Sequence, residues 1–439
     1  MTSILKPSPI SGFPEWLPEQ KLVEEQMLQT MRSIFESYGF TPIETAAVER
    51  KAIVAAKGVA DKELYALERL GAAPGEDAST ELALHFDLTV PTARYVAQNY
   101  GKLVFPFRRY QIQKVWRGER PQAGRFREFY QCDIDVVGHE TLDLLVDAEM
   151  LAVVDQVFRS LNVGRTLFRI SNRKILHGLL SHGGLAGEAM TSAMLAIDAL
   201  EKLGMDRVRE ALTQAGLRAA TTVLELISSP ISISELVSLD RGPFFALGVK
   251  ELELVSEGLK QFGVDEDRYA IDLTIARGLD YYTGTVYETR LTSEPELGSI
   301  CSGGRYENLA SAYSKQVLPG VGLSIGLTRL LSRLFEKGEL DTRKKTPAEV
   351  LVTMMDVEQR HFYIHVANKL REAGIPTELY TEPKKLKAQL KYADAKGFDT
   401  VILAGSREIE SNSVTVKSLR ERTQEEIPLA ELALRLKSR

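Results

Sequence analysis

Cysteine is almost absent from this sequence, since only Cys132 and Cys301 occur among its 439 residues. Two cysteines build no disulfide framework, and such scarcity is typical of proteins that fold in a reducing compartment. No apolar stretch is long enough to span a bilayer, and the first residues contain no apolar core of signal-peptide length. We therefore expect a cytoplasmic protein with no membrane partner.

An excess of positive charge is also missing. The formal net charge is −5, so any contact with nucleic acid must use local basic patches. No P-loop lysine motif occurs, and in the glycine-rich stretch from Gly320 the third glycine stands one place too late for a dinucleotide-binding loop. His361 and His365 have a spacing that zinc sites use, but no third ligand is near in the sequence. No metal site is predicted.

The stretch 107–137 concentrates polar groups on two predicted strands, 107–117 and 126–137, which a Gly- and Pro-containing loop joins. Because side chains alternate along a strand, Gln131, Asp133 and Asp135 share one face, with about 13 Å between the first and the last. Six arginines flank this face: Arg108, Arg109, Arg117, Arg120, Arg125 and Arg127. Arginine forks grip carboxylate and phosphate oxygens, so the face suits a ligand with phosphates and an ammonium or imidazole. An ordinary hairpin with solvated charges is an equally open alternative.

Three blocks of the sequence carry a resemblance to a known family, and the first lies within this stretch. The runs RGERP (117–121) and GRFREFYQ (124–131) resemble motif 2 of class II aminoacyl-tRNA synthetases, in a version similar to that of histidyl-tRNA synthetases. The run RGLDYYTG (277–284) resembles the histidine-binding motif of the same family. SICSGGRYENL (299–309) resembles its second histidine signature, CGGGRYDGL, and the paired glycines are expected to allow close approach of a ligand. Ser302 replaces a glycine there, which adds a Cβ near the pocket.

Softer similarities agree with this family. A predicted helix from residue 18 runs to the short strand 39–44, which resembles motif 1, the dimer interface of the family. The stretch 320–330 resembles motif 3, with Arg329 in the first turn of a helix. A strand followed by Asp87 and Thr89 resembles the segment that holds the α-amino group of histidine. His85 takes the place of the usual arginine, and Asp87 could instead only cap the next helix.

The resemblance implies a site for histidine and ATP, with Mg²⁺ sharing the phosphate charge. Arg117 and Arg277 would act on the carboxylate and the α-phosphate. The implied histidine-binding residues are Asp87, Thr89, Gln131, Asp135, Tyr281, Tyr282 and Tyr306. The implied ATP-binding residues are Arg117, Glu119, Arg125, Phe129 and Arg329, with Phe129 stacking on adenine.

The composition, 44% hydrophobic and 26% charged, is that of a globular protein. The implied fold class is α+β. An antiparallel six-stranded catalytic domain (1–335) would carry a helical insertion at about 172–262, and a linker (336–348) would lead to an anticodon-binding α/β domain (349–439). Lys384, Lys387 and Lys391 are predicted on one helical face with Lys385 beside it, as candidate tRNA contacts or as a solvated face.

The predicted function is that of a histidine–tRNA ligase. Two alternative functions are considered beside it. The implied partners are tRNA(His), histidine, ATP and a second copy of the chain. One alternative is the non-catalytic, histidine-sensing regulatory subunit of ATP phosphoribosyltransferase. That relative normally lacks the anticodon domain and has commonly lost the catalytic arginines, whereas Arg117, Arg277 and Arg329 are present here. The other is a nucleic-acid-binding module with an inactive synthetase fold, and the intact arginines argue against it.

Overall fold

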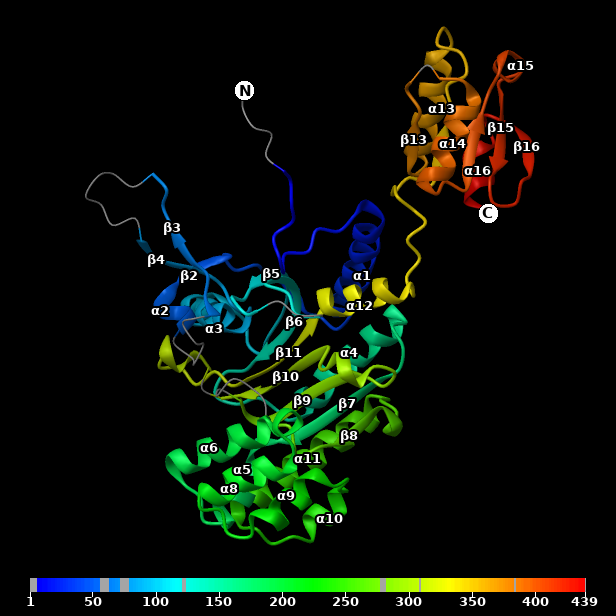
Figure 1. The fold of residues 1–439 in the computed structure, drawn as a ribbon. Coiled ribbons are helices and arrows are strands. Elements are labelled where there is room, and N and C mark those ends of the chain that lie inside the picture. Colours follow the sequence, from blue (N-terminus) through cyan, green and yellow to red (C-terminus); the bar gives the residue numbers. More distant parts are fainter. Residues whose placement is uncertain are drawn as a thin grey trace. The chain divides into compact units, whose positions relative to one another are not determined.

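The computed structural model describes residues 6–55, 63–71, 79–120, 124–276, 282–307, 309–382 and 384–438. Its internal contacts divide the chain into two compact units (Figure 1). The first comprises Met1–Pro14 and Leu28–Leu334, and the second comprises Glu15–Met27 and Phe335–Arg439. Among the helices in the described ranges, none is long and apolar enough to cross a membrane.

The first unit is built on an eight-stranded sheet with the order β1-β5-β6-β11-β10-β9-β7-β8. The strands in that order are β1 (Thr41–Pro42), β5 (Phe107–Trp116), β6 (Glu128–Val137), β11 (Gly320–Gly326), β10 (Cys301–Tyr306), β9 (Tyr282–Leu291), β7 (Thr166–Asn172) and β8 (Tyr269–Ile271). The six central strands are antiparallel to their neighbours, as predicted. The edge strands β1 and β8 are parallel to theirs, and the six-stranded prediction left them out.

One face of this sheet forms a hydrophobic core with α4 (Leu145–Leu161) and with the part of α1 (Pro18–Ser37) that follows Met27. Cys132, Ile134 and Val136 are each at most 1% exposed and project toward this core, because alternate residues of a strand point to one side. Tyr110 of β5 contacts Phe35 of α1, with 5.7 Å between the ring centroids. The opposite face of β6 therefore presents the polar residues.

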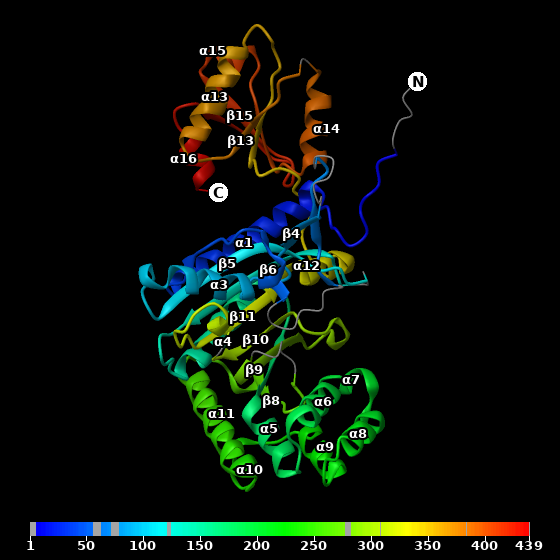
Figure 2. The same ribbon diagram turned by 90° about the vertical axis from the view of Figure 1, so that its left-hand side faces the viewer.

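The remaining elements of the first unit lie around this sheet. A small sheet with the order β2-β4-β3 contains β2 (Val48–Arg50), β4 (Ser79–Leu84) and β3 (Ala66–Glu68), and the helices α2 (Lys51–Val54) and α3 (Thr89–Asn99) accompany it. The helical insertion is α5 (Arg173–His182), α6 (Gly187–Asp198), α7 (Leu200–Leu203), α8 (Met205–Gln214), α9 (Ala220–Ser228), α10 (Ile233–Val237) and α11 (Pro243–Gln261). Figures 1 and 2 show these helices gathered beyond the β7–β8 edge. The helix α12 (Leu327–Lys337) follows β11 directly.

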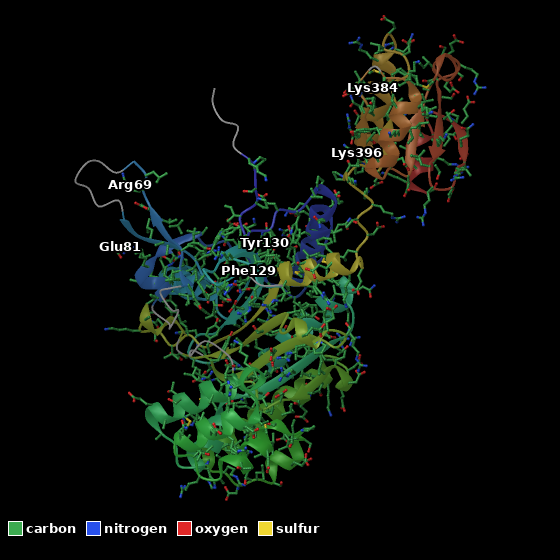
Figure 3. The ribbon with its side chains drawn as sticks, in the orientation of Figure 1. Arg69, Glu81, Phe129, Tyr130, Lys384 and Lys396 are labelled. Carbon is green, nitrogen blue, oxygen red and sulfur yellow. The ribbon has the colours of Figure 1, made fainter. Side chains whose placement is uncertain are left out.

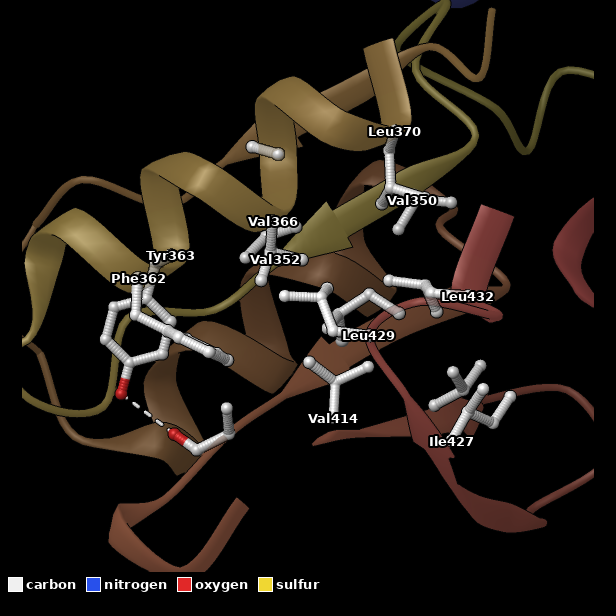
Figure 4. Packing of buried hydrophobic residues seen from close by; sticks show 14 of the residues in the cluster. Val350, Val352, Phe362, Tyr363, Val366, Leu370, Val414, Ile427, Leu429 and Leu432 are labelled. Atoms are coloured by element: carbon white, nitrogen blue, oxygen red, sulfur yellow. Dashed lines mark hydrogen bonds between the residues drawn. The ribbon is translucent and has the colours of Figure 1, made fainter. Parts of the chain in front are cut away.

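The second unit contains a five-stranded sheet with the order β13-β12-β14-β15-β16. Its strands are β12 (Val350–Val352), β13 (Thr377–Leu379), β14 (Thr400–Leu403), β15 (Ser413–Ser418) and β16 (Gln424–Pro428), and its helices are α13 (Arg360–Glu372), α14 (Leu386–Lys396), α15 (Ser406–Glu410) and α16 (Leu432–Lys437). Figure 4 shows Val352, Val366, Val414 and Leu429 packed in its core. One prediction is wrong here: Lys384 precedes α14, so it does not lie on the helical face.

Candidate active site

The polar face of β6 contains a buried ion pair. Arg109 of β5 lies opposite Asp135 of β6, and the guanidinium is 2.5 Å from the Asp135 carboxylate. The hydroxyl of Tyr306 donates a hydrogen bond of 3.0 Å to the other carboxylate oxygen. The Arg109 side chain is wholly buried. Because an unpaired charge is costly in such a place, the arginine fixes the position of Asp135.

Glycines of β11 create the room that these side chains occupy. A Cβ at Gly322 would lie 2.1 Å from Asp135 Oδ1, and one at Gly320 would lie 2.5 Å from the Tyr306 ring. The paired glycines of β10, Gly303 and Gly304, were expected to let a ligand approach, but the structure indicates another role for them. A Cβ at Gly303 would lie 2.0 Å from the carbonyl oxygen of Gly322, and one at Gly304 would lie 2.6 Å from a carbonyl oxygen of β9. These two glycines therefore permit close approach of the neighbouring strands.

An inner cavity lies over this glycine-lined part of the sheet. Its lining residues are Thr89, Asp133, Asp135, Tyr282, Ser302, Tyr306, Gly322, Leu323 and Ser324. Burial raises the pKa of Asp133 to about 7 and that of Asp135 to about 6, although Arg109 opposes both shifts. Desolvation disfavours the ionised form of a carboxyl group, and a nearby cation favours it. The cavity is therefore suited to a ligand that brings a cationic or hydrogen-bond-donating group.

Asp87 and Gln131 each present a buried acceptor at this site. Asp87 Oδ1 accepts a 3.1 Å hydrogen bond from the amide of Val90 in the first turn of α3. Its Oδ2 is buried and accepts no hydrogen bond from the described residues. Gln131 donates to Ser324 Oγ at 2.6 Å, and its buried amide oxygen is likewise unpaired within the described ranges. Such acceptors suit an ammonium group.

His85, which stands where the family pattern has an arginine, is buried beside Trp116. Its side chain is wholly buried, Nε2 lies 2.7 Å from the carbonyl oxygen of Lys114, and its ring packs against Trp116 with 5.4 Å between centroids. Burial lowers the pKa of His85, which favours the neutral ring. The residue therefore packs the wall behind the site.

An outer cavity of about 270 Å³ adjoins the inner one, and both are lined by Ser302 and Ser324. All five residues expected at ATP line the outer cavity: Arg117, Glu119, Arg125, Phe129 and Arg329. The Arg117 guanidinium lies 4.3 Å from the centre of the Phe86 ring and 5.1 Å from that of Phe129, and its Nε donates to the carbonyl of Phe86. Aromatic faces hold a guanidinium in place by cation–π attraction.

The two other arginines of the outer cavity are held differently. Arg329 donates to the carbonyl oxygens of Gly124 (2.7 Å) and Ser299 (2.9 Å), which orients it at the start of α12. Arg125 is half exposed and pairs with Glu119 at 3.1 Å. Figure 3 labels Phe129, the aromatic floor of this cavity. Oriented cations around an aromatic surface suit a nucleotide with its phosphates.

Arg277 and Tyr281 fall outside the described residues. The four lysines are exposed in the second unit, where Lys384 pairs with Glu382 at 2.5 Å (Figure 3). Among the described residues, no group of three or more histidine, cysteine, aspartate and glutamate side chains could hold a metal ion.

Asp133, Ser302 and Ser324 are among the lining residues that had no predicted role. The alternation of β6 already placed Asp133 on the polar face, so its burial was the missing information. Ser324 lies on β11, which pairs with β6 across nearly two hundred residues of sequence, with Ser324 opposite Asp133. The pairing of two strands so far apart in the chain cannot be inferred from the local residue pattern.

The comparisons with known proteins now identify the family. The family model for histidyl-tRNA synthetase matches residues 12–330, and the model for the anticodon binding domain matches residues 349–439. The chain is 43% identical to a histidine–tRNA ligase of Nostoc sp. strain PCC 7120, with 98% of this chain and 97% of that protein covered. It is 44% identical to that of Clostridium tetani, with 98% and 97% covered.

Solved structures agree with these matches. The crystal structure of histidyl-tRNA synthetase from Nostoc sp. PCC 7120 matches with a TM-score of 0.90 and 41% identity, covering 99% of this chain and all of that one. A structure from Bacillus halodurans, described as an ATP phosphoribosyltransferase regulatory subunit/histidyl-tRNA synthetase, has the same fold with a TM-score of 0.73 and 20% identity over 89% of this chain and 97% of that one. The chain belongs to the histidyl-tRNA synthetase family of class II aminoacyl-tRNA synthetases.

Proposed function

We propose that this protein is a histidine–tRNA ligase, which activates histidine with ATP and transfers it to the 3′ end of tRNA(His). One observation carries the proposal: a cavity with buried acids and a cavity with oriented arginines share two lining residues, Ser302 and Ser324. An amino acid placed across them would have its cationic groups over the acids and its carboxylate toward the arginines. That is the orientation that the activation step requires.

Histidine would bind over the inner cavity. Asp87, Thr89 and Gln131 are proposed to hold the α-ammonium group, because the first and third present unpaired buried acceptors. Asp135 and Tyr282 are proposed to contact the two imidazole nitrogens. Tyr306, which donates to Asp135, lines the same pocket, and Tyr281 is assigned from the family motif alone. A side chain without these nitrogens would leave buried polar groups unpaired, so the site would reject it strongly.

Activation brings a carboxylate against an anionic α-phosphate. An oxygen of the histidine carboxylate attacks the α-phosphorus, and the bond to the bridging oxygen breaks to release pyrophosphate. Arg117 is proposed to neutralise charge at the reacting groups together with Arg277, while Arg125 and Arg329 bind the outer phosphates and Phe129 stacks on adenine. The 3′-terminal ribose hydroxyl of the tRNA then attacks the carbonyl carbon, and AMP leaves.

One protein residue of this site could be a ligand of a magnesium ion. Glu119 is the one carboxylate among the residues that line the outer cavity, and Mg²⁺ is usually held by one or two carboxylates together with phosphate oxygens. Bound there with ATP, the ion would supply Lewis-acid neutralisation of the phosphate oxygens. Glu119 also pairs with Arg125 at 3.1 Å.

The second unit is proposed to bind the anticodon end of the tRNA, with residues 336–348 as the linker to it. Lys387 and Lys391 are exposed on α14, and Lys384 and Lys385 are exposed just before it; these lysines are proposed to contact tRNA phosphates. A homodimer and a cytoplasmic location are proposed from the family and from the scarcity of cysteine.

Histidine-dependent exchange of pyrophosphate into ATP, measured with and without tRNA, tests the proposal. Exchange that requires histidine and no other amino acid, followed by histidylation of tRNA(His), is the expected result. Intact histidine binding without any exchange would instead support the regulatory role of the ATP phosphoribosyltransferase subunit. Bound tRNA without ATP turnover would support an inactive nucleic-acid-binding module.

A further inference from the structure

A cluster of ion pairs lies at the far end of the sheet face that carries the site, and Arg169 of β7 is at its centre. Arg169 lies opposite Glu288 of β9, and Glu288 lies opposite Ser302 of β10. Residues directly opposite each other in antiparallel strands project from the same face. Because Ser302 lines both cavities, Arg169 belongs to one cross-strand row that continues into the active site.

Every nitrogen of the Arg169 guanidinium donates a hydrogen bond to a side chain. The acceptors are Asp272 Oδ2 at 2.6 Å from Nε, Thr274 Oγ1 at 3.2 Å from one terminal nitrogen, and Glu288 Oε2 at 2.8 Å and Glu201 Oε1 at 3.2 Å from the other. The Arg169 side chain is only 13% exposed, so water screens these contacts weakly. One planar cation thereby fixes β9, the segment after β8 and the helical insertion relative to one another.

The segment after β8, residues 272–276, is held at both of its ends. Asp272 is bound by Arg169, and its other carboxylate oxygen accepts from the amide (3.0 Å) and the hydroxyl (2.5 Å) of Thr274. At the other end, Arg173 donates to the carbonyl oxygen of Ala276 at 3.3 Å. The next residue in the chain is Arg277. The last five residues before this proposed catalytic arginine are therefore anchored to β7 and to the start of α5.

The helical insertion takes part in the cluster through Glu201, a residue of α7. Figure 2 labels this helix. Its carboxylate accepts from Arg169 and, at 2.8 Å, from Arg290 of β9. Arg290 also donates to Glu288 at 3.1 Å. A shift of α7 would therefore alter the hydrogen bonds of the guanidinium that anchors residues 272–276.

We propose that Arg169 is a positioning residue for histidine activation, and that Glu201 couples the helical insertion to it. Arg169 fixes the segment 272–276, which directly precedes the proposed catalytic Arg277 in the sequence. The inference rests on the proposed ligase function. Its physical basis is that charge neutralisation in a phosphoryl-transfer step depends steeply on the placement of the cation, and about 1 Å of misplacement can reduce the rate roughly 100-fold.

The test is single-turnover formation of histidyl-adenylate by the full-length Arg169→Lys variant. Lysine keeps the positive charge but lacks the planar fork, so it cannot bond to four acceptors at once. We expect the rate constant to fall roughly 10- to 100-fold while the apparent affinities for histidine and ATP change little. Glu201→Gln should reduce the rate in the same direction by a smaller factor. This second variant is also the test if Arg169→Lys does not fold, since Glu201 is 45% exposed.

Arg165→Lys is the matched control. Arg165 precedes β7 and pairs with Asp267 at 2.6 Å, and both side chains are more than half exposed. The described side-chain hydrogen bonds of Arg165 go to Asp267 and not to the segment 272–276. Its rate should equal that of the unmodified protein.

A double-mutant cycle separates positioning from an independent effect. If Arg169 acts through Arg277, Arg169→Lys should cause little further loss in an Arg277→Ala background, because residues that act as a unit are not additive. Equal losses in both backgrounds would overturn the inference, as would an unchanged rate in Arg169→Lys and Glu201→Gln. Failure of the proposed function is distinguishable, because the unmodified protein would then form no adenylate from histidine and ATP.

Discussion

Replacing Gly322 with alanine should selectively weaken histidine binding. The added Cβ would lie 2.1 Å from Asp135 Oδ1, far closer than a carbon and an oxygen can approach. Asp135 has little freedom to withdraw, because the buried Arg109 lies 2.5 Å from one of its oxygens and Tyr306 bonds to the other at 3.0 Å. Overpacking of this kind costs typically 1–3 kcal/mol.

If that cost falls on the histidine pocket, the dissociation constant for histidine should rise roughly 5- to 150-fold. Isothermal titration calorimetry with histidine, and the histidine KM in pyrophosphate exchange, would measure it. Gly326→Ala is the matched comparison on the same strand, because a Cβ there would meet only the carbonyl oxygen of Ile300 at 3.8 Å. Its histidine affinity should be nearly unchanged. A folded Gly322→Ala protein with normal histidine affinity would refute the assignment of Asp135 to the imidazole.

Three further predictions concern charge. Arg277→Ala should nearly abolish pyrophosphate exchange and leave tRNA binding intact, and near-normal exchange would refute the role of that arginine. Burial raises the pKa of Asp133 to about 7, whereas the pKa of an aspartate in the unfolded chain is about 4. Between these two pH values the folded state binds more protons than the unfolded state. The free energy of unfolding should therefore fall as the pH rises from about 4 to about 7. Urea titrations at pH 5 and pH 8 should show this fall, and a smaller one for Asp133→Asn. Replacing Lys385, Lys387 and Lys391 with alanine should raise the KM for tRNA and weaken its salt dependence, with exchange unchanged; an unaltered KM would favour a merely solvated face.

The sequence predicted those parts of the fold that follow from short-range periodicity. The two-residue period of strand 126–137 placed Gln131, Asp133 and Asp135 on one face, and the structure confirms it. The helix from Pro18 ends at Ser37, just before Gly39, whose φ of +77° suits glycine. Recognition of the family motifs then supplied the class II architecture, which composition alone could not.

The side-chain and backbone contacts between neighbouring strands of the sheet could not be predicted from the sequence. The partner of Asp135 is Arg109, one of six flanking arginines with no local feature to distinguish it. Gly303 and Gly304 were expected to admit a ligand, but the carbonyl oxygens of adjacent strands occupy that space. The strand β16 and the helix α16 after residue 419 were not anticipated, because their short apolar runs carry no clear period and are defined by packing in the second core.

The distribution of charge over the site favours catalysis over histidine sensing. A sensor needs only the acids of the inner cavity, whereas arginines fixed at the outer cavity add ordering and desolvation costs that histidine binding alone would not offset. Yet two of the three outer arginines are held in place: Arg117 lies against two aromatic rings, and Arg329 donates to two backbone carbonyls. Such orientation before any ligand arrives stabilises charge that develops during reaction, and it is most useful where a carboxylate must meet a phosphate. The geometry of the outer cavity is therefore the stronger argument for adenylate formation.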